Sequence, residues 1–146
     1  MFEKSELSDL AGALLRGLQV PKKNKNYARI AEYSATIFGL SIHSMPQERF
    51  HENADKIMIF FRGFVNFCGS AVGLSDDESI EAFEVFFVEI TGLPRGDAAM
   101  TFSVMDRMAK TQEGIALVKA GERAAFQCQE GRTSKAIAAL GKALGH

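Results

Sequence analysis

The stretch IMIFFRGFVNFCGSAVGL, at residues 57–74, decides the fold of this 146-residue chain. Its polar side chains are those of Arg62, Asn66 and Ser70. A membrane-spanning helix needs about 20 mostly apolar residues, and an arginine near its centre costs roughly 2.5–3.5 kcal/mol on insertion scales. The stretch is therefore better explained as a helix buried inside a globular protein. Because Pro46 suits a first helical position, we predict a central helix over about residues 46–72.

Helical periodicity continues on both sides of this central helix. Apolar residues recur at the spacing of a helix face in six further segments, and no alternation typical of strands persists. We expect these helices at about residues 5–19, 27–38, 75–91, 98–110, 112–129 and 134–144. The connections between them are short, which favours antiparallel neighbours. The sequence therefore predicts an all-α fold, a bundle of about six to seven helices, with residues 1–146 in a single domain.

Several helix ends carry recognisable capping residues. Ser75 and Glu78 have the spacing of a capping box, in which each side chain bonds to the backbone N–H of the other residue. Gly39 suits the end of the second helix, while Asp97 and Thr111 suit the starts of two later helices. No proline separates segments 97–110 and 112–129, so the sequence leaves open whether they form one helix.

Composition and cysteine content limit the class of protein. Hydrophobic residues make up 47% and charged residues 24%, which is ordinary for a globular protein and argues against disorder. The two cysteines, Cys68 and Cys128, lie far apart without a partner motif, so we expect buried thiols in a reducing compartment. The charged N-terminal residues lack the apolar core of a signal peptide. We therefore expect a cytoplasmic protein that does not enter a membrane.

The segment predicted as the helix over 75–91 is apolar on two sides and rich in acidic residues. A helix that is apolar on two sides needs two packing partners, which suggests an interface with another chain. Residues 76–97 hold seven acidic residues and one arginine, an asymmetry that favours docking to a basic surface. The candidate partner-binding residues are Phe83, Val85, Phe87, Val88, Glu81 and Glu84.

These features favour a non-enzymatic protein–protein interaction module. Such a protein acts by docking helix faces, as a small regulator, inhibitor or immunity-type protein does. Its partner is another protein or a second copy of itself, with a homodimer as the expected assembly. The sequence assigns no catalytic residue, because it contains neither a nucleophile elbow nor a glycine-rich phosphate loop. We expect no cofactor.

Two alternatives rest on other clusters. A basic patch with one aromatic residue suits a nucleic-acid-associated regulator, since cations contact phosphates and a ring stacks on a base; its residues are Lys22, Lys23, Lys25, Tyr27 and Arg29. A helical metal-binding protein or enzyme is suggested by His51 and Asp55, which are four residues apart and share one side of a continuous helix. That pair still lacks further ligands, so our main prediction includes no metal.

Overall fold

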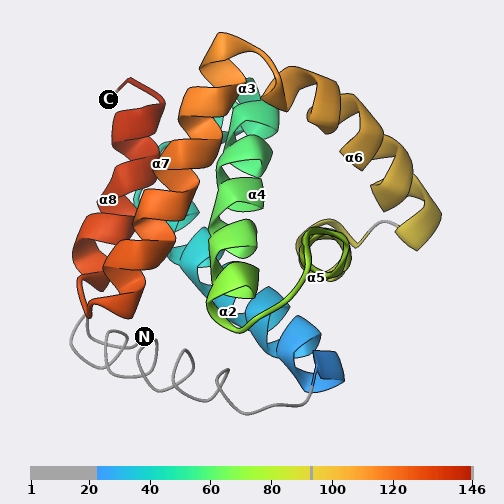
Figure 1. The fold of residues 1–146 in the computed structure, drawn as a ribbon. Coiled ribbons are helices and arrows are strands. Elements are labelled where there is room, and N and C mark those ends of the chain that lie inside the picture. The colour runs from blue at the N-terminus through green and yellow to red at the C-terminus, as the bar shows by residue number, and fades with distance from the viewer. Residues whose placement is uncertain (1–22, 93, 146) are drawn as a thin grey trace.

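The computed structural model describes residues 23–92 and 94–145, and every regular element within them is an α-helix (Figure 1). In chain order the helices are α2 (Lys23–His43), α3 (Gln47–Glu52), α4 (Ala54–Ala71), α5 (Asp76–Thr91), α6 (Arg95–Ala109), α7 (Gln112–Gln129) and α8 (Thr133–Ala143). Their packing confirms the predicted all-α bundle. The helix predicted over residues 5–19 lies outside the described residues. Among the described helices, none has the length and apolarity needed to cross a bilayer.

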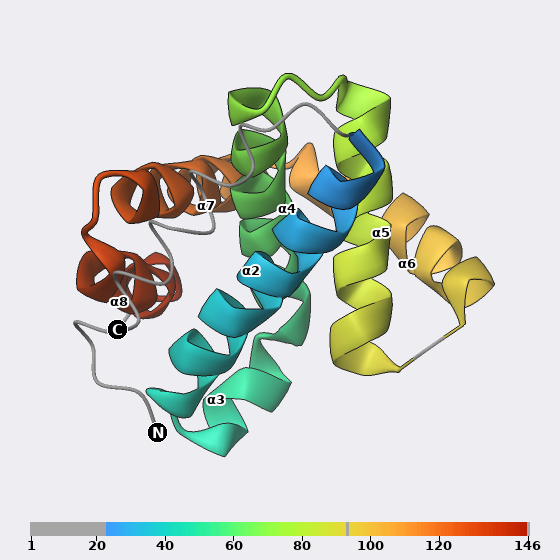
Figure 2. The same ribbon diagram turned by 90° about the horizontal axis from the view of Figure 1, so that it is seen from below.

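Helix α4 lies at the centre of the bundle, as the sequence predicts. It contacts α2, α3, α5, α6 and α7. In Figures 1 and 2 it runs between the α7–α8 pair on one side and α5 on the other, with α2 crossing it. Its ten buried residues follow one another closely from Ile57 to Gly69, so the helix is covered on nearly all sides. A helix that is apolar nearly all round requires such a position.

The helix predicted over residues 46–72 is interrupted at Asn53, which separates α3 from α4. Asn53 has φ −117° and ψ 19°, away from helical values. Its side-chain amide donates to the Arg49 carbonyl over 2.9 Å, and its backbone N–H bonds to the Arg49 and Phe50 carbonyls. Asparagine side chains that bond to nearby backbone compete with helix continuation. The prediction of one long helix is therefore wrong at this residue.

Helix α2 is longer than predicted at both ends. The prediction placed it over residues 27–38 with Gly39 as its cap, whereas it runs from Lys23 to His43. Gly39 lies inside the helix, and a Cβ added there would meet nothing within 4 Å. Ser41, two residues later, is buried. The helix continues past the glycine because its next residues still pack against the bundle, and at its other end it includes residues 23–26.

The caps of α5 and α7 are confirmed. The Ser75 hydroxyl accepts a hydrogen bond from the Glu78 backbone N–H over 3.2 Å, and the Glu78 carboxylate accepts one from the Ser75 N–H over 3.0 Å. The Thr111 hydroxyl accepts from the Gly114 N–H over 3.1 Å. Since Thr111 caps a new helix, α6 and α7 are two separate helices, which answers the question that the sequence left open.

The predicted start of α6 is wrong by three residues. The helix begins at Arg95, directly after Pro94, so Asp97 lies within its first turn and is not its cap. Pro94 has φ −59° and ψ 152°, and no side chain caps this end. Proline fixes its own φ near −65° and has no N–H group, so it is tolerated at a helix start and not inside a helix. The helix therefore starts where the proline allows it.

Helices α4 and α7 pack side by side in parallel, not antiparallel. The Lys56 ammonium lies 2.8 Å from the Glu113 carboxylate near the start of both helices. Near their ends, the rings of Phe67 and Phe126 meet edge to face with centroids 6.1 Å apart. The chain passes through α5 and α6 between them, and this long connection permits the parallel arrangement.

Two glycines allow the backbones of α4 and α7 to touch. A Cβ on Gly63 would overlap the Val118 carbonyl, and a Cβ on Gly121 would overlap the Phe60 carbonyl. Each helix thus presents a glycine to the backbone of the other. Small residues at a helix crossing permit this close approach, which larger residues prevent. The contact between α4 and α7 is the most extensive between any two of the described helices.

Candidate functional site

A groove of about 490 Å³ lies in the described part of the molecule. Residues of α4, α5, α6 and α7 line it. Figure 1 shows α5, α6 and α7 arranged around α4. Its apolar lining consists of Ile80, Phe83, Ala109, Ile115 and Val118. We call this cavity the central groove. Its size lies in the range of about 300–1,000 Å³ that is common for binding sites.

Charged side chains of both signs surround the apolar lining. They are Arg62, Lys110, Lys119, Asp76, Asp106 and Glu122. Three are basic and three are acidic, so the groove selects for neither a strongly anionic nor a strongly cationic ligand. Such a mixed rim around an apolar strip matches the two faces of an amphipathic helix.

An ion pair ties α6 to α4 across the groove. The Arg62 guanidinium donates to the Asp106 carboxylate over 2.7 Å, and Lys110 lies 3.4 Å from the second oxygen of Asp106. The hydrogen bond from Arg62 is the main reason why the pKa of the Asp106 carboxyl lies below its usual range, and Lys110 adds to the effect. This pair links α6 to α4, the central helix of the bundle.

The structure places the predicted partner-binding residues of α5 on different sides of the helix. Phe83 and Phe87 are only 2% and 5% exposed and belong to the core. Val85 and Val88 are half-buried and pack against that core. Helices α2, α4 and α6 all contact α5, so its two apolar sides find partners within the chain. Of the predicted set, Phe83 lines the central groove.

The acidic members of that set lie nearer to solvent. Glu81 is exposed and Glu84 is half-buried. By helical spacing they share a side of α5 with Val85 and Val88, away from Phe83. Asp77, one turn before Glu81, is exposed as well. The outer side of α5 is therefore an acidic surface beside the groove.

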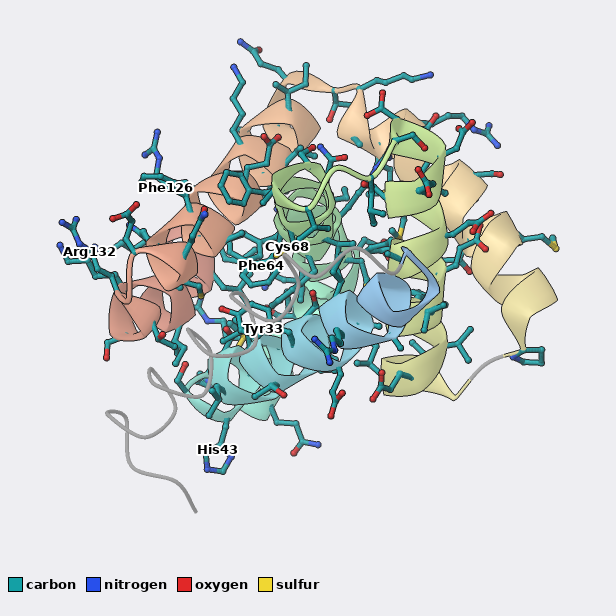
Figure 3. The ribbon with its side chains drawn as sticks, turned by 60° about the horizontal axis from the view of Figure 1, so that its bottom comes forward. Tyr33, His43, Phe64, Cys68, Phe126 and Arg132 are labelled. Atoms are coloured by element: carbon teal, nitrogen blue, oxygen red, sulfur yellow. The ribbon has the colours of Figure 1, made fainter. Side chains whose placement is uncertain are left out.

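Four large apolar side chains that the sequence did not single out are exposed. Met100 and Val104 on α6 are 73% and 53% exposed, and Ile115 on α7 is 46% exposed. Phe126 on α7 is 48% exposed, and Figure 3 shows it at the outer side of that helix. The available signal was that α6 carries apolar residues on two sides, with Met105 buried on the other side.

The predicted basic patch is described only in part. Lys22 lies outside the described residues, and Lys23, Lys25 and Tyr27 belong to the first turns of α2 without described side chains. Arg29 is half-buried on α2. Whether this segment binds nucleic acid therefore stays a prediction.

The predicted metal pair does not lie on one continuous helix. His51 belongs to α3 and Asp55 to α4, with the break at Asn53 between them. The premise that four-residue spacing puts both on one helix side is wrong for this reason. Among the described side chains, no three potential ligands of the His, Cys, Asp or Glu type lie together.

Both cysteines lie in the core beside Tyr33. Figure 3 shows Tyr33, Phe64 and Cys68 gathered inside the bundle, and the Tyr33 ring stacks on Phe64 with centroids 5.7 Å apart. Cys68 and Cys128 are buried free thiols. Burial raises the pKa of Cys128 to about 11 and raises that of Cys68 further. Since the thiolate is the reactive form, these thiols are not poised as nucleophiles at neutral pH.

Comparison with known proteins gives no relative. No family model matches the chain, and no curated protein or solved structure shows significant similarity to it. The central groove is therefore the feature of the described residues that bears on function.

Proposed function

We propose that the protein is a non-enzymatic interaction module that binds a helix of another protein chain in the central groove. The observation that carries this proposal is the apolar strip of the groove, which continues outward to the half-exposed Ile115. Apolar side chains of this size at a concave surface mark a contact site rather than a solvated face.

A helix fits this groove better than a small ion or metabolite does. The rim charges balance, so they supply no strong attraction for a compact charged ligand. An amphipathic helix places apolar residues along the strip and polar residues against the rim.

The proposal includes a regulatory, inhibitory or immunity-type role in the cytoplasm. Such roles need binding without chemistry. The two free cysteines support a reducing compartment. Their burial and raised pKa support a role in packing, which agrees with a protein that acts by docking.

The test is native mass spectrometry of the protein purified gently from its host. We expect a complex of the chain with a second polypeptide, either another protein or a further copy. Ile115→Asp places a charge in the apolar strip and should release the bound chain. Ala116→Asp is the matched control, because Ala116 is exposed on the same helix but does not line the groove.

The result expected is a loss of at least about tenfold in affinity for Ile115→Asp, equivalent to about 1.4 kcal/mol, with the control unchanged. A complex that survives Ile115→Asp as well as Ala116→Asp contradicts binding in the groove. A chain found only as a bare monomer contradicts the interaction module altogether.

A further inference from the structure

We propose that the helix bound in the central groove carries an acidic and a basic side chain about two turns apart on its apolar face. The acidic side chain lies at the end of the groove where α6 meets α7, and the basic one lies toward the start of α5. This inference rests on the proposed function and states which helix the groove selects. It follows from the rim charges, which balance in total but are separated along the groove.

The end of the groove where α6 meets α7 holds a basic cluster. Figure 1 shows the end of α6 and the start of α7 together beside α4. The Arg62 guanidinium lies 2.7 Å from the Asp106 carboxylate, and the Lys110 ammonium lies 3.4 Å from its second oxygen. Two basic groups thus share one acidic group, which leaves a positive charge at this end.

Lys119 of α7 adds a second positive charge at the same level. A Cβ on Gly63 would overlap the Val118 carbonyl, so these two residues mark where α4 meets α7. Arg62 precedes this glycine and Lys119 follows this valine, and both cations line the groove. Three basic groups against one acidic group give this end of the groove a balance of +2.

The other end of the groove is acidic. A Cβ on Gly69 would overlap the Ser79 hydroxyl, which places the start of α5, and Asp76 with it, beside Gly69. Gly69 is seven residues further along α4 than Arg62, or about 10 Å. Glu122 lies one turn beyond the groove lysine of α7, in the same direction because α4 and α7 are parallel. These two acidic residues give this end a balance of −2.

The charges that a partner would meet are not already paired. Lys119 and Asp76 are exposed and Glu122 is half-buried. Among the described residues, none of the three forms an ion pair. A bound helix can therefore contact them without breaking a contact that stabilises the single chain.

The separation of the two ends fits the surface of one helix. Residues seven positions apart lie on the same side of a helix and about 10 Å apart, with two further residues of that side between them. A partner with an acidic residue, apolar residues and a basic residue at this spacing meets the basic end, the apolar strip and the acidic end together. Opposite charges placed in this way select the orientation of the bound helix.

The test measures the binding of two synthetic peptides to the purified full chain by fluorescence anisotropy. Each is an amphipathic helix of about 18 residues, since shorter helices are marginal in water. The first carries glutamate and lysine about seven residues apart on its apolar face, and the second carries glutamine at both positions. We expect about threefold to tenfold tighter binding of the charged peptide, the effect of two partly exposed ion pairs. High salt should reduce this preference by screening the charges.

A variant that exchanges two rim charges tests their order. Lys119→Glu combined with Glu122→Lys keeps the net charge but brings both ends of the groove to a balance of zero. The preference for the charged peptide should disappear in this variant. Arg123→Glu combined with Glu130→Arg is the control, because it makes the same exchange at exposed positions outside the groove and should keep the preference. Circular dichroism checks that both variants are folded.

The two proposals fail in distinguishable ways. If the wild-type chain binds both peptides equally and Ile115→Asp removes both, the charge order is overturned and binding in the groove stands. A preference that survives the exchange of Lys119 and Glu122 also overturns the charge order. If neither peptide binds, this inference is overturned, and the complex sought by native mass spectrometry decides the proposed function separately. A preference lost in the groove variant and kept in the control supports both proposals.

Discussion

At the scale of single residues, two glycines inside helices have different effects on the fold. Gly121 stands against the Phe60 carbonyl at the crossing of α4 and α7, whereas Gly39 faces open space on α2. Both lie inside helices, where alanine is intrinsically preferred by about 1 kcal/mol. The atoms around each glycine therefore decide whether its replacement by alanine raises or lowers the free energy of unfolding.

Gly121→Ala should lower the free energy of unfolding by about 1–3 kcal/mol, because the added methyl overlaps backbone atoms that cannot move aside cheaply. Gly39→Ala is the matched control and should raise the free energy of unfolding by about 0.5–1 kcal/mol. Urea denaturation of the three proteins measures both effects. Equal changes in the two variants would show that α4 and α7 do not touch through backbone.

At the scale of elements, the sequence predicted a helix end where one pattern of adjacent residues determines it. It did not predict a helix end where two patterns compete. The capping box at Ser75 and Glu78 was predictable because its pattern lies within four consecutive residues. The break at Asn53 was not, since asparagine is tolerated in many helices and acts here through a bond to Arg49. Asp97 was an attractive cap, but Pro94 starts the helix earlier.

The attachment of α6 to the bundle depends on the pair of Arg62 and Asp106. Asp106→Asn should reduce the hydrogen-exchange protection of α6 by about twofold to fivefold at pH 7, the range of a partly exposed ion pair. Global stability should change little. Glu113→Gln, which removes the exposed pair with Lys56, is the control and should leave α6 protection unchanged.

The pH dependence of this attachment follows from the lowered pKa of Asp106. A carboxyl whose pKa is lower in the folded state stabilises that state above its ordinary pKa of about 4. Protection of α6 in the wild type should therefore persist at neutral pH and decline as the pH falls below about 4. Asp106→Asn should remove this decline, and an unchanged pH profile would contradict the role of the pair.

At the scale of the whole molecule, the class of fold was predictable but the pairing of helices was not. Periodicity shows that a helix face needs burial without showing what buries it. For that reason the two apolar sides of α5 suggested another chain, although α2, α4 and α6 cover them. The parallel contact of α4 with α7 depends on the matching of Gly63 and Gly121, which are far apart in sequence.

The candidate site was difficult to predict for the same reason. Phe83 was the one predicted residue that lines the central groove. Ile115 is the first residue of the apolar run at 115–118, so periodicity alone does not distinguish it from Leu117, which is buried in the core. The groove is formed where four helices meet, and no local sequence pattern predicts which helices meet.

The continuous core predicts cooperative unfolding of the described helices. Residues of α2, α4, α5, α7 and α8 share one cluster, and both thiols lie within it. In urea, the loss of helical circular dichroism and the labelling of Cys68 and Cys128 should therefore follow one transition. Cys128→Ser leaves Cys68 as the thiol that is labelled, so the labelling of the two cysteines can be measured separately. Labelling that precedes the loss of helix would indicate that the core opens in parts.

The parallel pair of α4 and α7 has a consequence during synthesis. A ribosome adds about 5–20 residues per second, so several seconds pass between the synthesis of α4 and the synthesis of α7, which covers it. Through that interval the growing chain carries the uncovered stretch that begins at Ile57, including the glycine face that α7 will occupy. We therefore expect the nascent chain to bind chaperones that shield apolar helices on the ribosome.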